Sequence, residues 1–492
     1  MRNEIRFLRR GLEVRLDNLN PMLTLLDYLR LQERALGTKE GCAEGDCGAC
    51  TVVLRKLIDG HLVYQPVNAC ILLAGQADGS DVIAVDDLAD GTLHPVQQAM
   101  VEKHGSQCGF CTPGFVMALF ALYHARRRGE LERSQVNDWI AGNLCRCTGY
   151  RPIIDAALAA CAQSAQDQFA AQEPEIAHRL ATLADGQDVF VGDADRFFAA
   201  PASVAALAEL YARHPGAVLV AGATDVGLWI TKQLRDLAKI IWLGRVRGLD
   251  LVRDEPDAVT FGATLTHQDA MAHLAAIDPD LAALMRRFAG RQVRTVGTIG
   301  GNIANGSPIG DTPPALIALA STLTLQRGEQ IRTLPLEDFF IAYGKQDRQP
   351  GEFVRSVRVP KLGPNDRFRC YKISKRFDSD ISAVMGAFRF TLDHGRIASA
   401  RVAFGGMAAT PRRAGGAEAA LLGVALSDQA SWSRAFVALE SDFSPIDDQR
   451  ASAQYRRDAA RGLLRKALTE VAGAPSAHTR VVDRREDASV AS

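Results

Sequence analysis

The chain has 492 residues, of which 47% are hydrophobic and 23% charged, and its 57 basic and 57 acidic side chains balance. This length predicts three or four domains. Zero net charge argues against nucleic acid or an anionic membrane as a partner. The charged N-terminus lacks the apolar stretch of a signal peptide, and no apolar run approaches the roughly 20 residues of a membrane-spanning helix. We therefore expect a cytoplasmic protein.

Residues 1–82 are predicted to form short strands around one helix. Residues 21–31 have helical apolar spacing, with Pro21 in the first turn. Two strands, 51–57 and 61–64, flank a hairpin turn. A glycine-rich loop, residues 41–50, lies between the helix and the hairpin. This order of elements is typical of a β-grasp ferredoxin domain.

Four cysteines of this first region have the spacing of a plant-type ferredoxin, Cys42-x4-Cys47-x2-Cys50 followed by Cys70. Glycines on the same loop let backbone N–H groups turn toward cluster sulfurs. A structural zinc site is the alternative, although such sites usually have two C-x2-C knuckles. We expect this first quartet to bind a [2Fe–2S] cluster.

A second quartet, Cys108-x2-Cys111 followed by Cys145-x-Cys147, falls in residues 83–165, where the pattern is helical. One helix is predicted over 113–128, another from a cap at Ser134 to Ala141, and a third opening at Pro152. The quartet should therefore lie on turns between helices. Spacing alone also fits zinc. The two remaining cysteines, Cys161 and Cys370, are expected to be ordinary buried thiols.

The rest of the chain divides by composition. Residues 166–195 are polar and are expected to form a linker with a helical piece. Residues 196–366 have an α/β pattern, and residues 367–475 an α+β pattern ending in a helix over 454–471. The tail, 476–492, is polar, and we expect disorder from Ala474 onward.

Two segments after the linker place glycine and small polar residues beyond a strand, residues 219–226 and 295–302, the second continuing to Asp311. Such backbone can approach a diphosphate closely. Ordinary turn glycine is the alternative for either segment alone. Neither segment is G-x-G-x-x-G, so a Rossmann-bound dinucleotide is not expected.

The wording of these motifs resembles one family. Cys42-Ala-Glu-Gly-Asp-Cys-Gly-Ala-Cys-Thr-Val52 is similar to the first iron–sulfur domain of the molybdenum hydroxylases, especially their xanthine dehydrogenase branch. Gln107-Cys-Gly-Phe-Cys-Thr-Pro-Gly114 and Asn143-Leu-Cys-Arg-Cys-Thr-Gly-Tyr-Arg-Pro152 resemble the second, helical-bundle domain. Phe288-Ala-Gly-Arg-Gln-Val-Arg-Thr295 and the two glycine segments resemble the family's FAD domain, which is of the vanillyl-alcohol-oxidase (PCMH) type. The implied fold class is multidomain α+β, ending in a flavoprotein C-terminal domain like that of CO dehydrogenase.

The resemblance implies a set of FAD contacts, position by position. Asp311 would bind the adenosine part and Phe288 would lie against the flavin ring, while Val354 and Lys372 occupy further flavin-contacting positions. For Phe288 and Val354, plain core packing is the alternative. The stretches around the diphosphate and ribityl would be Leu219, Val220, Ala221, Gly222, Ala223, Thr224, Asp225, Val226, Thr298, Ile299, Gly300, Gly301 and Asn302.

The resemblance also implies an electron-transfer function. A molybdopterin centre on a separate large subunit would oxidise hypoxanthine or xanthine to urate, and electrons would pass through the second quartet, the first quartet and FAD to NAD+. No side chain here is expected to be catalytic, and an (αβ)2 heterotetramer is the implied assembly. The electron acceptor stays open between NAD+ and oxygen. In the charged loop 372–381, Phe377 and Ser379 differ from the residues that animal enzymes have there. An ordinary solvated loop is the alternative for this segment.

Three alternatives remain at this point. A related molybdenum hydroxylase that acts on an aldehyde or another N-heterocycle would share every motif, because the substrate site lies on the other subunit. A stand-alone iron–sulfur flavoprotein reductase would have no molybdenum partner. A zinc-binding interaction module would be colourless.

Overall fold

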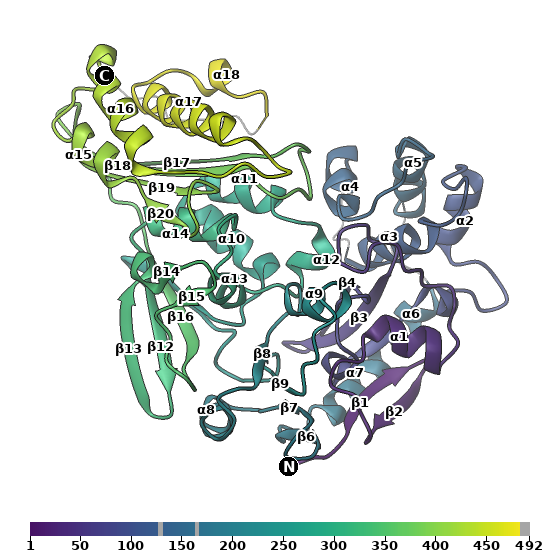
Figure 1. Cartoon of the computed structure of the whole chain (residues 1–492). Helices are drawn as coiled ribbons and strands as arrows, with labels where there is room; N and C mark the ends of the chain where they lie inside the picture. The colour runs from purple at the N-terminus through teal and green to yellow at the C-terminus, as the bar shows by residue number, and fades with distance from the viewer. Residues whose placement is uncertain (126–130, 163–166, 483–492) are drawn as a thin grey trace. The chain divides into compact units, whose positions relative to one another are not determined.

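The computed structural model describes residues 1–125, 131–162 and 167–482 (Figure 1). The chain forms two compact units. Unit 1 comprises Met1–Gly248 together with the short segment Ala289–Thr298, and unit 2 comprises Leu249–Phe288 and the chain from Ile299 onward. Among the helices of the described ranges, none combines the length and apolar character needed to cross a bilayer.

Unit 1 begins with a five-stranded sheet in the order β2-β1-β5-β3-β4. Asp59 and Gly60 have φ of 49° and 79° at the tight turn between β3 and β4, which confirms the predicted hairpin. The strands are β1 (Ile5–Arg9), β2 (Leu12–Leu16), β3 (Thr51–Ile58), β4 (His61–Asn68) and β5 (Asp81–Ile83), with single 3-10 turns η2 (Ala74–Ala77) and η3 (Val85–Asp87).

The helix beside this sheet is shorter than predicted. It consists of α1 (Leu25–Asp27) continued by a π-helical turn, η1 (Tyr28–Gln32). Thr24 is its N-cap, because the Thr24 hydroxyl accepts the N–H of Asp27 at 3.0 Å. The prediction that Pro21 lies in the first helical turn is therefore wrong, since Pro21 belongs to the preceding turn.

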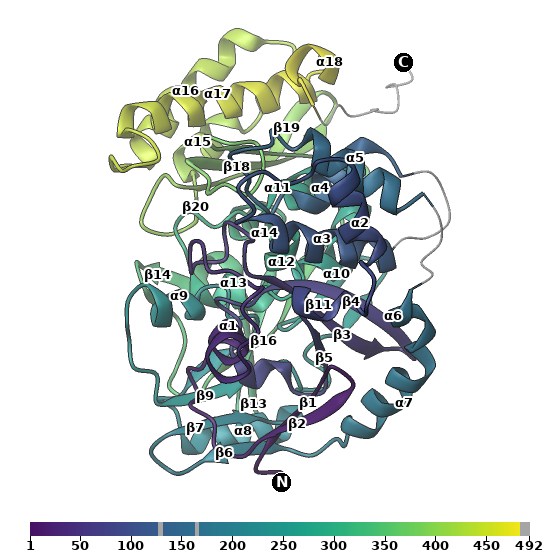
Figure 2. The same ribbon diagram turned by 90° about the vertical axis from the view of Figure 1, so that its right-hand side faces the viewer.

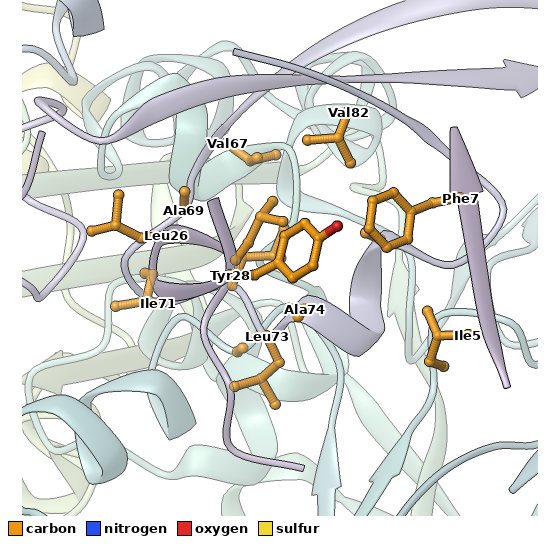
Figure 3. Packing of buried hydrophobic residues seen from close by; sticks show 14 of the residues in the cluster. Ile5, Phe7, Leu26, Tyr28, Val67, Ala69, Ile71, Leu73, Ala74 and Val82 are labelled. Carbon is orange, nitrogen blue, oxygen red and sulfur yellow. The ribbon is translucent and has the colours of Figure 1, made fainter. Parts of the chain in front are cut away.

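One apolar core joins the first sheet to the later part of unit 1. The rings of Phe7 and Tyr28 meet edge to face at 5.6 Å at its centre (Figure 3). The same cluster contains Phe198 and Trp242, which lie more than a hundred residues further along the chain. Sequence-distant parts of unit 1 are thus packed as one body.

Four helices follow the sheet: α2 (Pro95–Glu102), α3 (Thr112–Ala125), α4 (Arg133–Ile140) and α5 (Arg151–Ala160). α3 is buried along almost its whole length and packs on β3 and β4, while α2 packs on α5 (Figure 1). Ser134 is not the predicted cap, because Glu132 occupies the N-cap position of α4. Pro152 lies in the first turn of α5, as predicted. The predicted end of α3 over 126–128 lies outside the described residues.

The segment predicted as a linker packs more than expected. It contains α6 (Gln168–Ala171) and α7 (Glu173–Leu183), so a helical piece is present. Phe169, Ile176 and Leu180 are buried, however, and α7 lies against the first sheet. The sequence did not predict this packing, because the buried apolar residues are few and widely spaced in a polar segment.

A second sheet completes unit 1, in the order β6-β7-β9-β8. Its parallel pairs β7–β9 and β8–β9 place the end of β8 beside that of β9. The elements are β6 (Val189–Gly192), β7 (Phe197–Ala200), α8 (Val204–Arg213), β8 (Val218–Val220), α9 (Val226–Thr231) and β9 (Lys239–Trp242), and the inserted segment adds α12 (Arg291–Arg294).

Unit 2 contains an antiparallel sheet in the order β10-β11-β16-β12-β13 and a small hairpin, β14–β15. The strands are β10 (Val252–Asp254), β11 (Ala258–Gly262), β12 (Thr322–Arg327), β13 (Gln330–Pro335), β14 (Phe340–Ala342), β15 (Lys345–Gln346) and β16 (Phe353–Pro360). The helices are α10 (His267–Ile277), α11 (Pro279–Arg287), α13 (Ile299–Asn305), α14 (Thr312–Ala318) and the 3-10 turn η4 (Leu336–Phe339).

A four-stranded sheet, β17-β18-β19-β20, follows in unit 2. Its strands are β17 (Asp366–Ile373), β18 (Val384–Asp393), β19 (Arg396–Gly405) and β20 (Arg412–Arg413). α15 (Gly415–Leu421), α16 (Ser433–Asp442) and α17 (Ala453–Val471) gather beside this sheet, with the 3-10 turn η5 (Gln429–Trp432) before α16 (Figure 2).

The beginning of the C-terminal tail is ordered, contrary to the prediction of disorder from Ala474. It forms α18 (Ser476–Thr479), and Arg480 is buried. The Arg480 guanidinium donates to Asp280 at 2.7 Å and to Glu470 at 2.7 Å. The sequence did not predict this order, because the buried groups that hold the tail are charged and the tail is polar in composition. Residues beyond 482 are not described.

Candidate functional site

The first cysteine quartet lies on one loop and the turn after β4. Cys50 and Cys70 are buried, and Cys42 and Cys47 are partly exposed. Backbone N–H groups of Glu44 and Cys47 both point at Cys42 Sγ, at 3.4 Å. The loop achieves this with left-handed backbone at Ala43, Gly45 and Gly48.

The four thiols of this quartet are in mutual contact. Cys42 accepts hydrogen bonds from Cys47 and Cys70, which lowers the pKa of the Cys42 thiol. Donation to Cys42 raises the pKa of Cys47, and donation to Cys42 and Cys50 raises that of Cys70. Four converging sulfurs with N–H donors around them fit an iron–sulfur cluster, while the thiolate donors by themselves also suit zinc.

The second quartet lies on two turns between helices, as predicted, and is more open. Cys108 and Cys147 are exposed. Burial and donation to Cys145 raise the pKa of Cys111 to about 12. Donation to Cys108 raises the pKa of Cys147. Thr148 donates its hydroxyl to Cys145 Sγ at 3.2 Å. All four thiols therefore converge here too.

The two cysteine loops touch each other inside unit 1. The N–H of Leu144, which precedes Cys145, donates to the carbonyl of Cys47 at 3.0 Å. The backbone also approaches closely on either side of this bond. A β-carbon built on Gly48 would lie 2.3 Å from Gly142 O, and one built on Gly114 would lie 2.2 Å from Gly48 O. Only glycine fits such contacts.

The first predicted flavin segment, residues 219–226, runs from the end of β8 into α9. Ala223 has φ of 60°, and a β-carbon on Gly222 would lie 2.0 Å from Val296 O. Residues 219–226 and 295–298 are therefore in contact in unit 1. The carbonyl of Ala221 accepts Gln76 Nε2 at 2.9 Å and Trp242 Nε1 at 3.1 Å. This backbone cradle, free of side chains at its closest point, fits the diphosphate predicted there.

α9 links the flavin segment to the first quartet. A β-carbon on Gly227 would lie 2.6 Å from the carbonyl oxygen of Ile71, the residue after Cys70. At the other end of α9, Thr231 donates its hydroxyl to Ala43 O at 2.6 Å, beside Cys42. The short helix that follows the predicted flavin loop is therefore seated on the first cysteine loop.

Other predicted flavin residues belong to unit 2. Asp311 is buried, and its two carboxylate oxygens accept from Lys372 Nζ and from Ser382 Oγ, each at 2.5 Å. Lys372 and Asp311 are thus brought together as an ion pair. Because each carboxylate oxygen has two lone pairs, the pair leaves Asp311 able to accept a further hydrogen bond.

The remaining predicted contacts differ in their surroundings. The backbone of Gly300 lies against Ala263, and Asn302 Oδ1 accepts Thr312 Oγ1 at 2.5 Å. Phe288 is partly buried against the ring of His267, with centroids 4.5 Å apart. Val354 is buried in the apolar core of unit 2, which favours the core alternative for this residue. Ile299 and Gly301 lie on the same short helix, α13.

The charged loop 372–381 is held by one arginine of α11. Arg287 donates to Lys372 O at 2.9 Å and to Phe377 O at 3.1 Å, and its guanidinium stacks 4.5 Å from the Phe377 ring. Arg376 and Asp380 pair within the loop at 3.6 Å. The loop is solvated and at the same time fixed to the residue next to Phe288.

A buried His94, His124 and Asp167 cluster was not anticipated from the sequence. His94 Nδ1 accepts the N–H of Val96, so its Nε2 carries the proton and donates to Asp167 at 2.5 Å. A nitrogen that carries a proton cannot ligate a metal. Burial raises the pKa of Asp167, but the two histidine hydrogen bonds hold it well below its ordinary value. These hydrogen bonds connect the start of α6 to α2 and α3.

Comparison with protein families identifies three consecutive domains. Residues 84–158 match the [2Fe-2S] binding domain, residues 193–362 the FAD binding domain in molybdopterin dehydrogenase, and residues 369–471 the CO dehydrogenase flavoprotein C-terminal domain. The chain belongs to the molybdenum hydroxylase family. Its domains fit the iron–sulfur/FAD subunit of a molybdenum hydroxylase, and the predicted multidomain α+β fold class is confirmed.

Several curated xanthine dehydrogenases are similar over most of this chain. The xanthine dehydrogenase of Emericella nidulans is 32% identical over 95% of this chain and 38% of its own length. The xanthine dehydrogenase of Drosophila pseudoobscura pseudoobscura is 32% identical over 83% and 35%, and the xanthine dehydrogenase/oxidase of Rattus norvegicus 31% over 82% and 34%. The chain thus spans about a third of the length of the curated relatives it matches.

Solved structures of CO dehydrogenases and of a quinoline oxidoreductase are similar to slightly more than half of the chain. A chain of the cyanide-inactivated Cu,Mo-CO dehydrogenase is 26% identical with a TM-score of 0.53, over 56% of this chain and 96% of that one. A chain of the CO dehydrogenase of Hydrogenophaga pseudoflava is 28% identical with a TM-score of 0.52, over 55% and 95%. Quinoline 2-oxidoreductase from Pseudomonas putida 86, at 23% identity and a TM-score of 0.52, shows the fold alone.

The sequence did not single out several residues that join the sites. Asn143 and Gln292 lie within sequence motifs that resemble the family, but the motifs do not predict that the two side chains contact each other. Gln76 and Thr231 carry no motif. Their roles depend on contacts between segments that are far apart in the chain.

Proposed function

We propose that this chain is the electron-transfer subunit of a xanthine dehydrogenase. The proposal holds that a molybdopterin centre on a large partner subunit oxidises hypoxanthine or xanthine to urate, and that the electrons leave through this chain to NAD+. The named relatives support the xanthine assignment, each being a xanthine dehydrogenase or dehydrogenase/oxidase. A reducing cytoplasm suits the free thiols that the proposal requires.

The second quartet is proposed as the entry point of electrons. Cys108, Cys111, Cys145 and Cys147 would hold a [2Fe–2S] cluster, which accepts and releases one electron at a time. Exposure of Cys108 and Cys147 supports this order, because a partner subunit can approach an exposed edge. The role of the protein here is to hold the thiolates and to supply hydrogen bonds that tune the potential, such as Thr148 to Cys145.

The first quartet is proposed as the middle of the path. Cys42, Cys47, Cys50 and Cys70 would hold a second [2Fe–2S] cluster. The observation that carries the proposal is contact on both sides of this quartet. Cys47 O accepts from the loop of the second quartet, and Ile71, after Cys70, lies against the helix that follows the flavin loop.

The flavin segments are proposed to bind FAD, which converts single electrons into a hydride for NAD+ when bound. The backbone of residues 219–226 and 298–302 would hold the diphosphate and ribityl. Asp311 would accept from the adenosine part, with Lys372 fixing its carboxylate. Phe288 would pack against the ring, and Arg287 would hold the loop beside it. Family assembly as an (αβ)2 heterotetramer is part of the proposal.

The test is to purify the chain with its natural partner. The proposal predicts about four iron atoms and one FAD per chain, and NADH formation from xanthine and NAD+ that requires both subunits. Zinc in place of iron in both quartets would contradict it. Xanthine turnover with oxygen and not with NAD+ would show that oxygen is the acceptor, and the proposed electron path would be unaffected.

A second candidate is a molybdenum hydroxylase with another substrate. The structural neighbours that are CO dehydrogenases favour it, because their chains are similar to more than half of this chain. The same purified complex decides between the two. Reduction of the flavin by an aldehyde or another N-heterocycle, and not by xanthine, would select this candidate.

A further inference from the structure

A short piece of the flavin region is folded between the two cysteine loops. Ala289–Thr298 belongs to unit 1, whereas the chain on either side of it belongs to unit 2. α12 of this segment packs against β4 and α4. The guanidinium of Arg291 stacks 3.6 Å from the Trp139 ring of α4. The segment is thus anchored to both iron–sulfur domains.

Gln292 lies at the centre of a buried polar network. The residue is 1% exposed, and its Nε2 donates to Asn143 Oδ1 at 2.8 Å and to Thr51 Oγ1 at 3.2 Å. Asn143 Nδ2 in turn donates to Gly48 O at 3.0 Å, and the Thr51 hydroxyl donates to the same carbonyl at 2.6 Å. One amide therefore ties a residue two before Cys145 to a residue next to Cys50.

Gln292 Oε1 is a buried acceptor with no hydrogen-bond partner among the described residues. Its nearest surroundings are backbone, since a β-carbon on Gly142 would lie 2.1 Å from it. A buried polar atom without a partner has an energetic cost. A hydrophobic residue would avoid this cost, but it would leave Asn143 Oδ1 without the donor that Gln292 Nε2 supplies. What Gln292 contributes at this position is the two hydrogen bonds that its Nε2 donates.

The bonds made by Gln292 flank the contact between the loops. Asn143 is followed by Leu144, whose N–H donates to Cys47 O. The Asn143 amide is hydrogen-bonded to Gly48 O, which lies next to Cys47 in the chain. The same segment continues to the flavin loop, since Thr295 donates to Pro66 O at 2.8 Å and Val296 meets Gly222.

We propose that Gln292 is a positioning residue for electron transfer between the two cysteine quartets. The inference rests on the proposed function. Gln292 holds the Asn143 amide so that the Leu144 N–H stays on Cys47 O, which fixes the separation and the hydrogen-bonded route between the clusters. The step is one electron leaving the second-quartet centre, which is oxidised, and entering the first-quartet centre, which is reduced, with no bond made or broken.

The experiment compares Gln292→Met with the unchanged full chain, loaded with iron–sulfur clusters and FAD. Dithionite-reduced protein is examined by electron paramagnetic resonance, in which two nearby reduced clusters split each other's signals. Electron exchange between the clusters is timed after a light-driven reduction. We expect altered splitting and exchange slowed by about tenfold or more, as positioned reactions respond to small displacements. Iron and FAD content should not change.

Two controls make the result specific. Gln326→Met is the matched substitution at a buried glutamine of unit 2, whose Nε2 donates to Gly328 O at 2.8 Å, and it should change neither readout. Thr51→Val removes the shared hydroxyl and should reproduce the effect of Gln292→Met, whereas Thr51→Ser keeps the hydroxyl and should restore normal splitting. If Gln292→Met does not fold, the Thr51 pair decides.

Unchanged splitting and unchanged exchange in both Gln292→Met and Thr51→Val would overturn the inference. An equal effect in Thr51→Val and Thr51→Ser would also overturn it, because the hydroxyl would then not matter. Iron analysis of the unchanged chain separates this failure from that of the proposed function. A chain with fewer than two clusters would refute the electron path itself, and with it the role of Gln292.

Discussion

The ten cysteines have different surroundings, although none of them forms a disulfide. Eight converge in two groups, and Cys161 lies outside both groups in the buried helical core. Cys145→Ser should remove the second cluster, because an alcohol is a poor iron ligand, and should lower iron from about four to about two per chain. Cys161→Ser is the control and should keep all the iron. Metal analysis with visible absorbance measures both; equal iron in the two variants would contradict the assignment.

The Asp311–Lys372 pair is a second feature at this scale. Both side chains are about 5% exposed or less. Asp311→Asn leaves the ammonium without its carboxylate, and breaking a buried pair from one side costs roughly 3–5 kcal/mol. We expect a lower melting temperature and weaker FAD retention. The matched control is Asp257→Asn, at a carboxylate that is 75% exposed and pairs with Arg358, and it should change little. Equal loss in both variants would argue against a special role for Asp311.

Among the elements, the glycine contact between the cysteine loops depends on the absence of side chains. Gly142 faces Gly290 and the Gln292 amide so closely that any β-carbon would collide. Gly142→Ala should therefore displace the segment of Gly290 and Gln292 from the second cysteine loop and cost about 1–3 kcal/mol, as overpacking does. Gly216→Ala is the control, since a β-carbon there meets nothing within 4 Å. Thermal unfolding of the two variants should differ clearly; identical unfolding would show that the loops can yield.

The C-terminal element is held by charge. Burial raises the pKa of Glu470, but hydrogen bonds from Arg480 and Thr479 outweigh it and lower this pKa from 4.5 to about 2. A lowered carboxyl pKa stabilises the fold above the ordinary pKa, and this stabilisation is lost as pH falls from 4.5 to about 2. The contribution near neutral pH is on the order of 3 kcal/mol.

Arg480→Met tests the contribution of the Arg480–Glu470 ion pair. The variant should be less stable than the unchanged chain at pH 7, and the gap should narrow as the pH falls through that window. Thermal unfolding at several pH values measures the gap. A constant gap down to pH 2.5 would show that Glu470 does not titrate with the pair. Arg457→Met, at a partly exposed arginine on the same helix α17, is the control and should show no such gap.

The contrast between sequence and structure is clearest for these elements. Helix α17, the β3–β4 hairpin and the two cysteine turns were predictable, because apolar periodicity and turn residues act locally. The tail and the supposed linker were not, because their anchors are single buried groups such as Arg480 and Phe169 that bind distant partners. The cysteine spacing predicted both quartets. Gln292 was not predictable, since its meaning depends on a segment that folds away from its chain neighbours.

In the molecule as a whole, both cysteine quartets and the first flavin segment lie within one compact unit. Unit 1 contains both quartets, the contact between their loops, the glycine cradle of residues 219–226 and the inserted segment with Thr298. The chain passes between the units at Gly248–Leu249, at Phe288–Ala289 and at Thr298–Ile299. Binding of FAD should stabilise the fold by mass action.

The most direct test of the electron path uses the complex with its natural partner under anaerobic conditions. Xanthine is added, and the absorbance of the iron–sulfur clusters and the flavin is followed without any acceptor. The account predicts that both bleach with the partner present, that neither bleaches with this chain alone, and that Cys145→Ser in the complex prevents flavin reduction. Flavin that is reduced by xanthine at the normal rate in the Cys145→Ser complex would contradict a path through the two quartets.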